Sequence, residues 1–403
     1  MSFFRDLYYQ LQQLPRTIKL FYVSDIFFAF SQAIFATLFN LHLLKVGYNA
    51  EHIGSLQSLS ALLMALAAVP VGLVADRVGR RWFYVAGSVL FGIPYGVMPL
   101  LTDFRLLMVA YAIHTIGMAL MMVNESPLLA GEVGPDKRAS VFSFMMINFF
   151  LWNTLGIQLA GFLSKWLPPG QLSEYVWPLA LSACCAVIAG IIRAFLPFKP
   201  YLPARQALRI LPSRTALLLA LVSVLSGASM ALMQSFSNVV FAERFAFDSA
   251  TIATVMTVGG ILGWVASLFV PWTSQRLGEL RGYALVVSLQ GLLLIYLGMA
   301  ASPVTFLPGF WMRTILQNMQ MPLFSAFSMG VTADAERATA NSYAMVGRNL
   351  GAGVASGWLG VVLAGGDYLL AFAAAGIAAL ATAGVTLFAF RRTGAQTATD
   401  LQA

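Results

Sequence analysis

The sequence predicts an all-α membrane protein with twelve transmembrane helices in two pseudo-symmetric six-helix halves. The first observation behind this prediction is composition: of 403 residues, 59% are hydrophobic and only 10% are charged. Soluble domains carry about 25% charged residues, and the mean hydropathy of +0.78 also excludes an ordinary globular surface. The second observation is a series of long uncharged runs, and the third is the alternation of basic residues between successive loops.

The uncharged runs have the length of membrane-spanning helices. Residues 56–74 contain no charged residue, and neither do residues 106–124 apart from His114. A helix needs about 20 apolar residues to cross a bilayer. Only helices and closed barrels span lipid, and barrel strands would alternate in polarity over about ten residues. The runs therefore predict helices.

Twelve such segments follow one another along the chain. The predicted spans of the first set are 20–44, 53–75, 82–101, 105–130, 139–164 and 177–198. The spans of the second set are 215–241, 250–274, 283–301, 306–329, 338–363 and 368–390. Glycine and proline within them are compatible with membrane helices.

The distribution of lysine and arginine predicts the orientation. The loops on the side of the N-terminus hold most of these residues, whereas the opposite side holds only Lys45, Arg105, Lys165 and Arg244. Because positive loops stay in the cytoplasm, we expect both termini to be cytoplasmic in a multi-pass protein of the cell inner (plasma) membrane. The net charge of +8 is therefore read as a topology signal, and we expect no nucleic-acid partner.

The two halves resemble repeats. We predict an N-terminal six-helix half over 1–198, a cytoplasmic inter-half loop over 199–214, and a C-terminal half with a short cytoplasmic tail over 215–403. Displacing the sequence by 199 residues places Arg77-Val-Gly79 on Arg276-Leu-Gly278. Repeated halves are typical of transporters whose substrate site lies near the bilayer midplane.

The loop after the second span carries the most specific motif. It reads Gly72-x-x-x-Asp76-Arg77-x-Gly79-Arg80-Arg81. This loop resembles the signature loop of the major facilitator superfamily, and its place in a twelve-helix chain is also that of the family. The resemblance implies a conformational gate, which Glu132 would join as similar acids do in the family. The alternative is that these arginines only anchor the topology.

Other family patterns are absent, which leaves the subgroup open. The second copy of the loop has Gln275 at the place equivalent to Asp76. Tyr111 stands where drug–proton antiporters usually have an arginine, and their Gly-Pro pair is missing from 155–161. A sugar-porter signature is also missing, since Leu128 stands in place of its arginine.

Ionisable and amide side chains within the predicted spans are the candidates for a substrate or proton site, because polar groups in a bilayer are costly. The two acidic side chains lie in the N-terminal half, and the two arginines lie in the C-terminal half. The candidates are Asp25, Gln32, His114, Glu125, Gln234, Asn238, Arg313, Gln317, Gln320 and Arg348. For the isolated His114 and Arg348, packing or a structural pair between helices is the alternative.

Asp25 and Glu125 are both expected toward the cytoplasmic end of their spans. If they lie close together, their repulsion favours one bound proton, which makes them our candidate for proton coupling. The arginines of the C-terminal half would suit an anionic or zwitterionic substrate.

The sequence thus favours a secondary active transporter that moves a small amphiphilic organic solute by alternating access, with proton-coupled efflux. A sugar or metabolite importer is the alternative, and a non-transporting sensor or scaffold is the alternative of another class. No enzyme is expected, since His42, His52 and His114 form no ligand motif. We expect no cofactor and no metal, a monomer in the lipid bilayer, and protons as the coupling ion.

Overall fold

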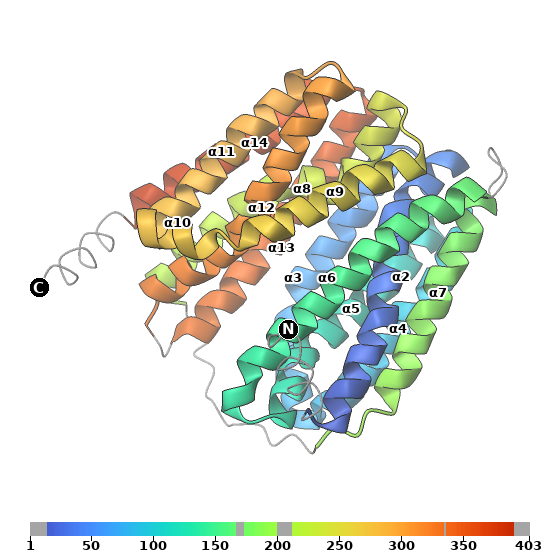
Figure 1. The fold of residues 1–403 in the computed structure, drawn as a ribbon, viewed down its shortest axis with the longest axis vertical. Helices are drawn as coiled ribbons and strands as arrows, with labels where there is room; N and C mark the ends of the chain where they lie inside the picture. The colour runs from blue at the N-terminus through green and yellow to red at the C-terminus, as the bar shows by residue number, and fades with distance from the viewer. Residues whose placement is uncertain (1–13, 167–172, 200–211, 334–335, 391–403) are drawn as a thin grey trace, which may run out of the picture. The chain divides into compact units, whose positions relative to one another are not determined.

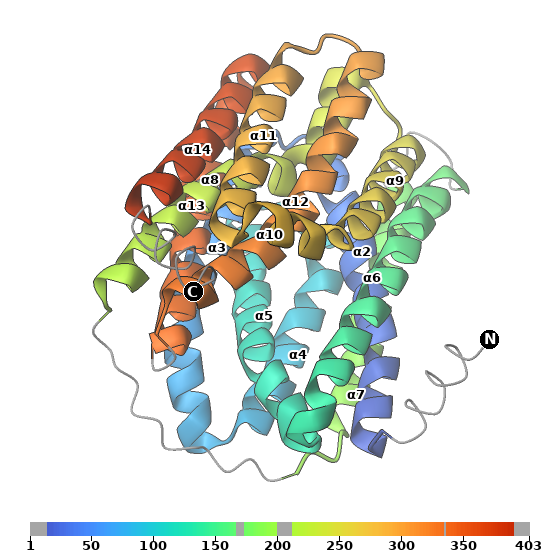
Figure 2. The same cartoon turned by 60° about the vertical axis from the view of Figure 1, so that its left-hand side comes forward.

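The computed structural model describes residues 14–166, 173–199, 212–333 and 336–390, and every regular element in these ranges is a helix. The first elements are α2 (Arg16–Val46), α3 (Ala50–Val78), α4 (Arg80–Val97), the 3-10 turn η1 (Met98–Leu100), α5 (Phe104–Glu132), α6 (Pro135–Trp166) and α7 (Ser173–Ala194). They are followed by α8 (Arg214–Phe245), α9 (Ser249–Ser267), α10 (Val270–Leu277), α11 (Glu279–Met299), α12 (Pro303–Val331), α13 (Arg337–Ala364) and α14 (Tyr368–Ala389). Figures 1 and 2 show these helices as elongated rods without a sheet.

These helices account for the twelve predicted spans. Within the described residues, ten are long and apolar enough by themselves to cross a membrane. The long helices α12 and α13, which carry Arg313 and Arg348, match two further predicted spans. The eighth span, predicted as one helix over 250–274, is divided into α9 and α10. Pro271 lies in the first turn of α10, where a backbone N–H would have no partner within the helix, so its absence costs nothing. In an unbroken helix, the same proline would remove one backbone hydrogen bond.

The predicted span 177–198 is too long at its C-terminal end. Helix α7 ends at Ala194. Pro197 follows closely, and the residue before a proline is disfavoured in helical geometry. The last turn of α7 therefore includes Arg193, a position that becomes important for the site.

Contacts divide the chain into two compact units, each described by itself. Unit 1 comprises Met1–Val46 and Ala67–Arg205, and unit 2 comprises Gly47–Leu66 and Gln206–Ala403. Helix α3 contributes residues to both units. The division differs from the predicted halves in residues 47–66, and the repeat halves themselves remain a prediction.

In unit 1, α2 packs against α6 and α7, and α4 packs against α5 and α7. The crossing of α4 and α5 is close because it is made through glycines. A Cβ atom added at Gly87 would come within 2.7 Å of the backbone nitrogen of Met121, and one added at Gly117 would collide with the backbone of Phe91. Small residues at such crossings let membrane helices approach closely.

In unit 2, α8 packs against α13 and α14, while α11 packs against α12 and α14. The α8–α13 crossing is also made through glycines. A Cβ atom at Gly227 would collide with the carbonyl oxygen of Arg348, and one at Gly351 would collide with that of Val224. This crossing fixes the backbone of Arg348 against α8.

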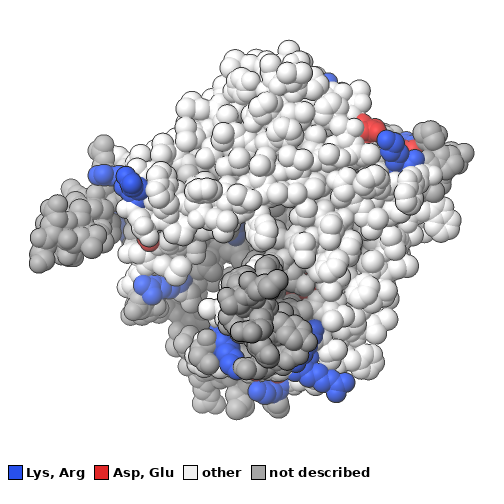
Figure 3. Space-filling model, viewed as in Figure 1, with Lys and Arg blue, Asp and Glu red and all other residues white. Residues whose placement is uncertain are grey.

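The outer surface is mostly uncharged. On the face drawn in Figure 3, most of the visible surface is uncharged, and most of the lysine and arginine atoms lie toward its edges. Large apolar side chains are well exposed, among them Leu66, Trp82, Phe195, Leu268 and Phe388. Such a surface is matched by lipid acyl chains and not by water.

Candidate functional site

Arg193 is the centre of a buried charge cluster in unit 1. Its side chain is 1% exposed. Its Nη2 atom lies 3.7 Å from Oδ1 of Asp25 on α2 and 3.7 Å from Oε2 of Glu125 on α5. Its Nε atom donates to the hydroxyl of Ser24, 3.4 Å away. One guanidinium therefore serves two carboxylates from two different helices.

Aromatic rings enclose this guanidinium. Its central carbon lies 4.3 Å from the ring centre of Phe28 and 5.6 Å from those of Phe21 and Tyr84. Rings of this kind attract a cation through their electron-rich faces. They also exclude water, which strengthens the attraction between Arg193 and the carboxylates.

The two carboxylates differ in their surroundings. Asp25 is 4% exposed and accepts a hydrogen bond of 3.0 Å from the side-chain amide of Asn148 on α6. Trp152, one turn further along α6, donates in turn to the Asn148 oxygen over 3.1 Å. Glu125 is 20% exposed and accepts a 3.2 Å hydrogen bond from the hydroxyl of Tyr84. By exposed surface, Asp25 is thus the more enclosed of the two acids.

The other predicted residues of unit 1 lie in an aromatic layer. Gln32 accepts a 2.6 Å hydrogen bond from the hydroxyl of Tyr95. Nδ1 of His114 donates to the carbonyl oxygen of Phe91 over 3.2 Å, and its ring lies 4.7 Å from the rings of both Phe91 and Tyr95. These contacts favour packing as the role of His114.

In unit 2, the predicted residues separate into two groups on α12. Arg313 is 6% exposed, and its Nη2 donates to the Gln317 side chain over 2.9 Å. Gln320 is buried, donates to the hydroxyl of Ser226, and accepts from Gln290, both over 2.9 Å. Its amide therefore joins α8, α11 and α12.

The remaining predicted residues of unit 2 are on α8 and α13. Arg348 contacts the Met321 sulfur atom of α12. Asn238 is buried, and its side-chain oxygen accepts from the backbone N–H of Val239, whereas Gln234 is exposed. In the described part of unit 2, neither Arg313 nor Arg348 forms an ion pair with a carboxylate.

The motif loop is held by an ion pair across the α3–α4 turn. Asp76 Oδ1 lies 2.6 Å from Nη2 of Arg80. Arg80 also donates from Nη1 to the Val123 carbonyl and the Asn124 side chain of α5, over 3.3 and 3.2 Å. The loop therefore ties the end of α3 and the start of α4 to α5.

The backbone of this turn requires glycine. Gly79 has a φ of 115°, and Gly278 at the equivalent place between α10 and α11 has a φ of 74°. Side chains with a Cβ atom rarely adopt such angles. Gly72 lies on α3, where a Cβ atom would touch the Val123 side chain at 3.6 Å.

The other members of the predicted gate do not take part in the Asp76–Arg80 ion pair. Arg77 and Arg81 are exposed. Glu132 is buried, and its Oε1 accepts a 2.7 Å hydrogen bond from the backbone N–H of Lys199. This bond ties the end of α5 to the segment after α7.

Sequence reasoning missed Arg193, Asn148 and Tyr84. Arg193 is not among the predicted candidates although it lies within the predicted span 177–198, and that position was the available signal. Asn148 and Trp152 are four residues apart on α6, which places them on one helix face. Nothing in the sequence indicates that Tyr84 would meet Glu125.

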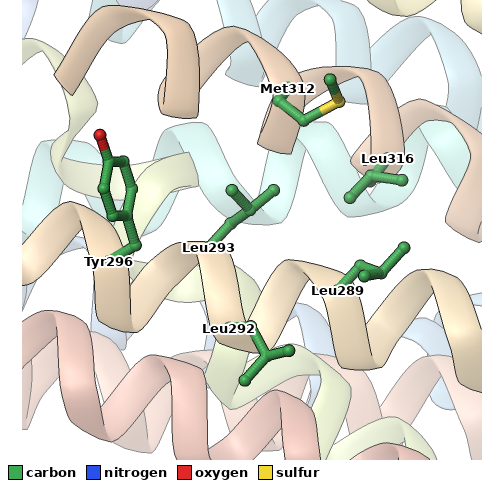
Figure 4. Close-up of a pocket in the computed structure, with 6 residues that line it drawn as sticks. All are labelled: Leu289, Leu292, Leu293, Tyr296, Met312 and Leu316. Atoms are coloured by element: carbon green, nitrogen blue, oxygen red, sulfur yellow. The ribbon is translucent and has the colours of Figure 1, made fainter. Parts of the chain in front are cut away.

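An apolar groove of about 420 Å³ lies on the outside of unit 2 (Figure 4). Its walls come from α11 and α12, and they are Leu289, Leu292, Leu293, Tyr296, Met312 and Leu316. None of the predicted site residues lines it. Because most of these side chains are well exposed, the groove belongs to the apolar outer surface and not to the charged clusters.

Comparisons with known proteins agree with the motif and the fold. The family model of the Major Facilitator Superfamily matches residues 21–312. The chain belongs to this superfamily. No curated protein matches it in sequence.

Solved structures similar to this superfamily member are transporters. The nucleoside transporter NupG has a TM-score of 0.72 and 16% identity, covering 94% of this chain and 99% of its own. A bacterial homologue of the iron transporter ferroportin, in an inward-facing state, has a TM-score of 0.76 and 14% identity, covering 92% and 98%. A proton-dependent oligopeptide transporter has a TM-score of 0.72 and 14% identity, covering 94% and 99%.

At such identities the likeness shows the fold alone. It establishes a multi-pass, all-helical membrane protein with the major facilitator fold. The family and the similar structures consist of transporters and not of enzymes, so this superfamily member is a transporter. Its cargo is a separate question that depends on its own residues.

Proposed function

We propose that the protein is a proton-coupled secondary transporter that exports a small amphiphilic organic solute by alternating access. Asp25 and Glu125 bind the coupling proton between them. The observation that carries this proposal is the single Arg193 guanidinium lying 3.7 Å from both carboxylates.

The summed charge of Asp25, Glu125 and Arg193 explains why the cluster would bind one proton. With both acids ionised, the three side chains sum to one negative charge, and with one proton bound they sum to zero. Burying a net charge in a membrane protein is costly. The cluster therefore holds one proton favourably when it is closed off from water and releases it when water reaches the acids.

The exposures of the two acids suggest a route for that proton. Glu125 has 20% of its side chain exposed and Asp25 has 4%. A proton therefore enters and leaves at Glu125, while Asp25 is held in place by Asn148. The two acids titrate as a coupled pair.

The motif loop is proposed as a gate in the same cycle. The two hydrogen bonds from Arg80 to α5 must break if α4 separates from α5, and the Asp76–Arg80 ion pair must break if α3 separates from α4. On the basis of its basic loops, we place the protein in the cell inner membrane with both termini in the cytoplasm. We propose that it acts as a monomer.

The coupling is tested in proteoliposomes with an imposed pH gradient. A solute found to be carried by the wild type is followed in two assays, pH-driven accumulation and solute exchange without a gradient. Asp25→Asn and Glu125→Gln are expected to abolish the accumulation while retaining exchange. Glu51→Gln, at an exposed acid of α3, is the control and keeps both activities.

Other results of the proteoliposome assay would contradict the proposal in different ways. Wild-type pH dependence in both acid variants would exclude proton coupling through this pair. Accumulation driven in the opposite direction would identify an importer. No solute flux above that of protein-free vesicles, for any compound class, would favour a non-transporting sensor or scaffold.

A further inference from the structure

Among the described residues, Arg313 is a buried cation without a carboxylate partner. It lies ten residues into α12, or about 15 Å along the helix axis, which is about halfway across a 30 Å hydrocarbon layer. Its side chain is 6% exposed. Nη2 donates to Gln317, but the buried Nε has no hydrogen-bond partner in the described part of the chain.

The membrane-spanning part of unit 2 offers Arg313 no acid. Acidic residues of its helices lie at the ends, such as Glu243 near the end of α8 and Glu279 at the start of α11. Helices α12, α13 and α14 contain no acidic residue at all. Arg348, the other arginine within these spans, has the sulfur of Met321 as its described contact. The described interior of unit 2 thus carries positive charge only.

Such a charge is costly unless something neutralises it. Arginine does not lose its proton in proteins, so it cannot escape the cost by becoming neutral. The guanidinium presents its donors in a planar fork that matches a carboxylate or phosphate with two parallel hydrogen bonds. Gln317 occupies one donor and restrains the side chain, while the buried Nε has no hydrogen-bond partner among the described residues.

We propose that Arg313, oriented by Gln317, binds the anionic group of the transported solute, so that the cargo is an organic anion with a carboxylate or comparable oxyanion. The proposal rests on the transport function proposed above and names its substrate class. In each unit, a ligand then neutralises an uncompensated charge. The acid pair of unit 1 binds the proton, and Arg313 of unit 2 binds the solute anion.

The test is equilibrium binding to the full-length protein in nanodiscs, at one fixed pH and without a gradient. Thermal stabilisation is measured with two matched series: naphthylacetic acid, its amide and naphthylethylamine, and octanoate, octanamide and octylamine. In at least one series, the acid is expected to bind the wild type about tenfold or more tightly than the amide, as loss of a charge-assisted hydrogen bond predicts. The amine is expected to bind most weakly.

Variants of Arg313 test whether the preference for the acid depends on this side chain. Arg313→Gln is expected to remove the advantage of the acid over the amide. Arg313→Lys keeps the charge but not the fork, so it retains a reduced advantage. Arg276→Gln, at an exposed arginine of α10, is the control and behaves as the wild type.

Measurements on the wild-type protein alone can overturn the proposal. If acid and amide act alike on the wild type in both series, or neither acid stabilises it, the solute is not recognised through its anionic group. An acid preference that survives in Arg313→Gln places the anion elsewhere and overturns the assignment. Because binding is measured at one fixed pH and without a gradient, failure of proton coupling and failure of anion binding remain distinguishable.

Discussion

At the scale of single residues, Arg193 decides how the acids of unit 1 behave. Asp25 and Glu125 were predicted from the sequence because they are carboxylates within apolar runs, and they were expected toward the same end. The structure places both within 3.7 Å of one Arg193 atom. The arginine itself was not predicted, since only the packing of α2, α4 and α5 around the last turn of α7 reveals its burial.

Replacing Arg193 tests this arrangement. Arg193→Gln leaves two carboxylates facing each other without a cation, and breaking a buried ion pair costs about 3 kcal/mol or more. We expect a marked fall in the thermal unfolding temperature of the purified protein. Asp25→Asn in the same chain removes one of the two charges and should restore part of the loss.

The stabilities of the single and double variants could also contradict this arrangement. If the double variant were no more stable than Arg193→Gln alone, the arginine would act through packing against Phe28 and not through charge. Arg138→Gln, at an exposed arginine of α6, serves as the matched control and should leave stability unchanged.

At the scale of elements, the uncharged runs were enough to place the helices, but not their interruptions. The break between α9 and α10 depends on Pro271, and the early end of α7 precedes Pro197. A proline within a membrane helix does not always end it: Pro127 remains inside α5 and Pro322 inside α12. Whether the freed backbone groups find other partners decides the outcome, and that depends on neighbouring helices.

The glycine crossing of α8 and α13 gives a prediction at this scale. Gly351→Ala adds a methyl group where the carbonyl oxygen of Val224 already lies, so the two helices must separate. Overpacking of this kind costs about 1–3 kcal/mol. The unfolding temperature in detergent should therefore fall.

Gly260→Ala is the matched control, because a Cβ atom there has nothing within 4 Å. It should leave stability unchanged or raise it by about 0.5–1 kcal/mol, since alanine favours a helix over glycine. Equal stability of the two variants would show that α8 and α13 do not cross as closely as described.

At the scale of the whole molecule, the family loop and the apolar composition were sufficient to predict the superfamily. The candidate site was predicted only in part, because the sequence marks which groups are costly in a membrane but not which of them meet. Arg313 and Arg348 illustrate the limit: their isolation from acids is visible along the sequence, whereas the Gln317 and Met321 contacts require the fold.

The orientation predicted from the basic loops is tested with reporters fused to the C-terminus. A fluorescent protein that folds only in the cytoplasm should fluoresce, and a phosphatase active only outside the membrane should remain inactive. Fusion directly after Met299, at the end of α11, should invert both signals because the number of crossings becomes odd. Fluorescence from both fusions would refute the assigned topology.

The shared guanidinium of Arg193 also has an electrical consequence. An acid pair with one cation alternates between zero and one negative charge as a proton binds and leaves. Whichever step of the cycle moves the unprotonated cluster through the membrane field is worth about 2.3 kcal/mol per charge for each 100 mV. The turnover of this transporter would then respond to voltage as well as to pH, with three side chains acting as its sensor.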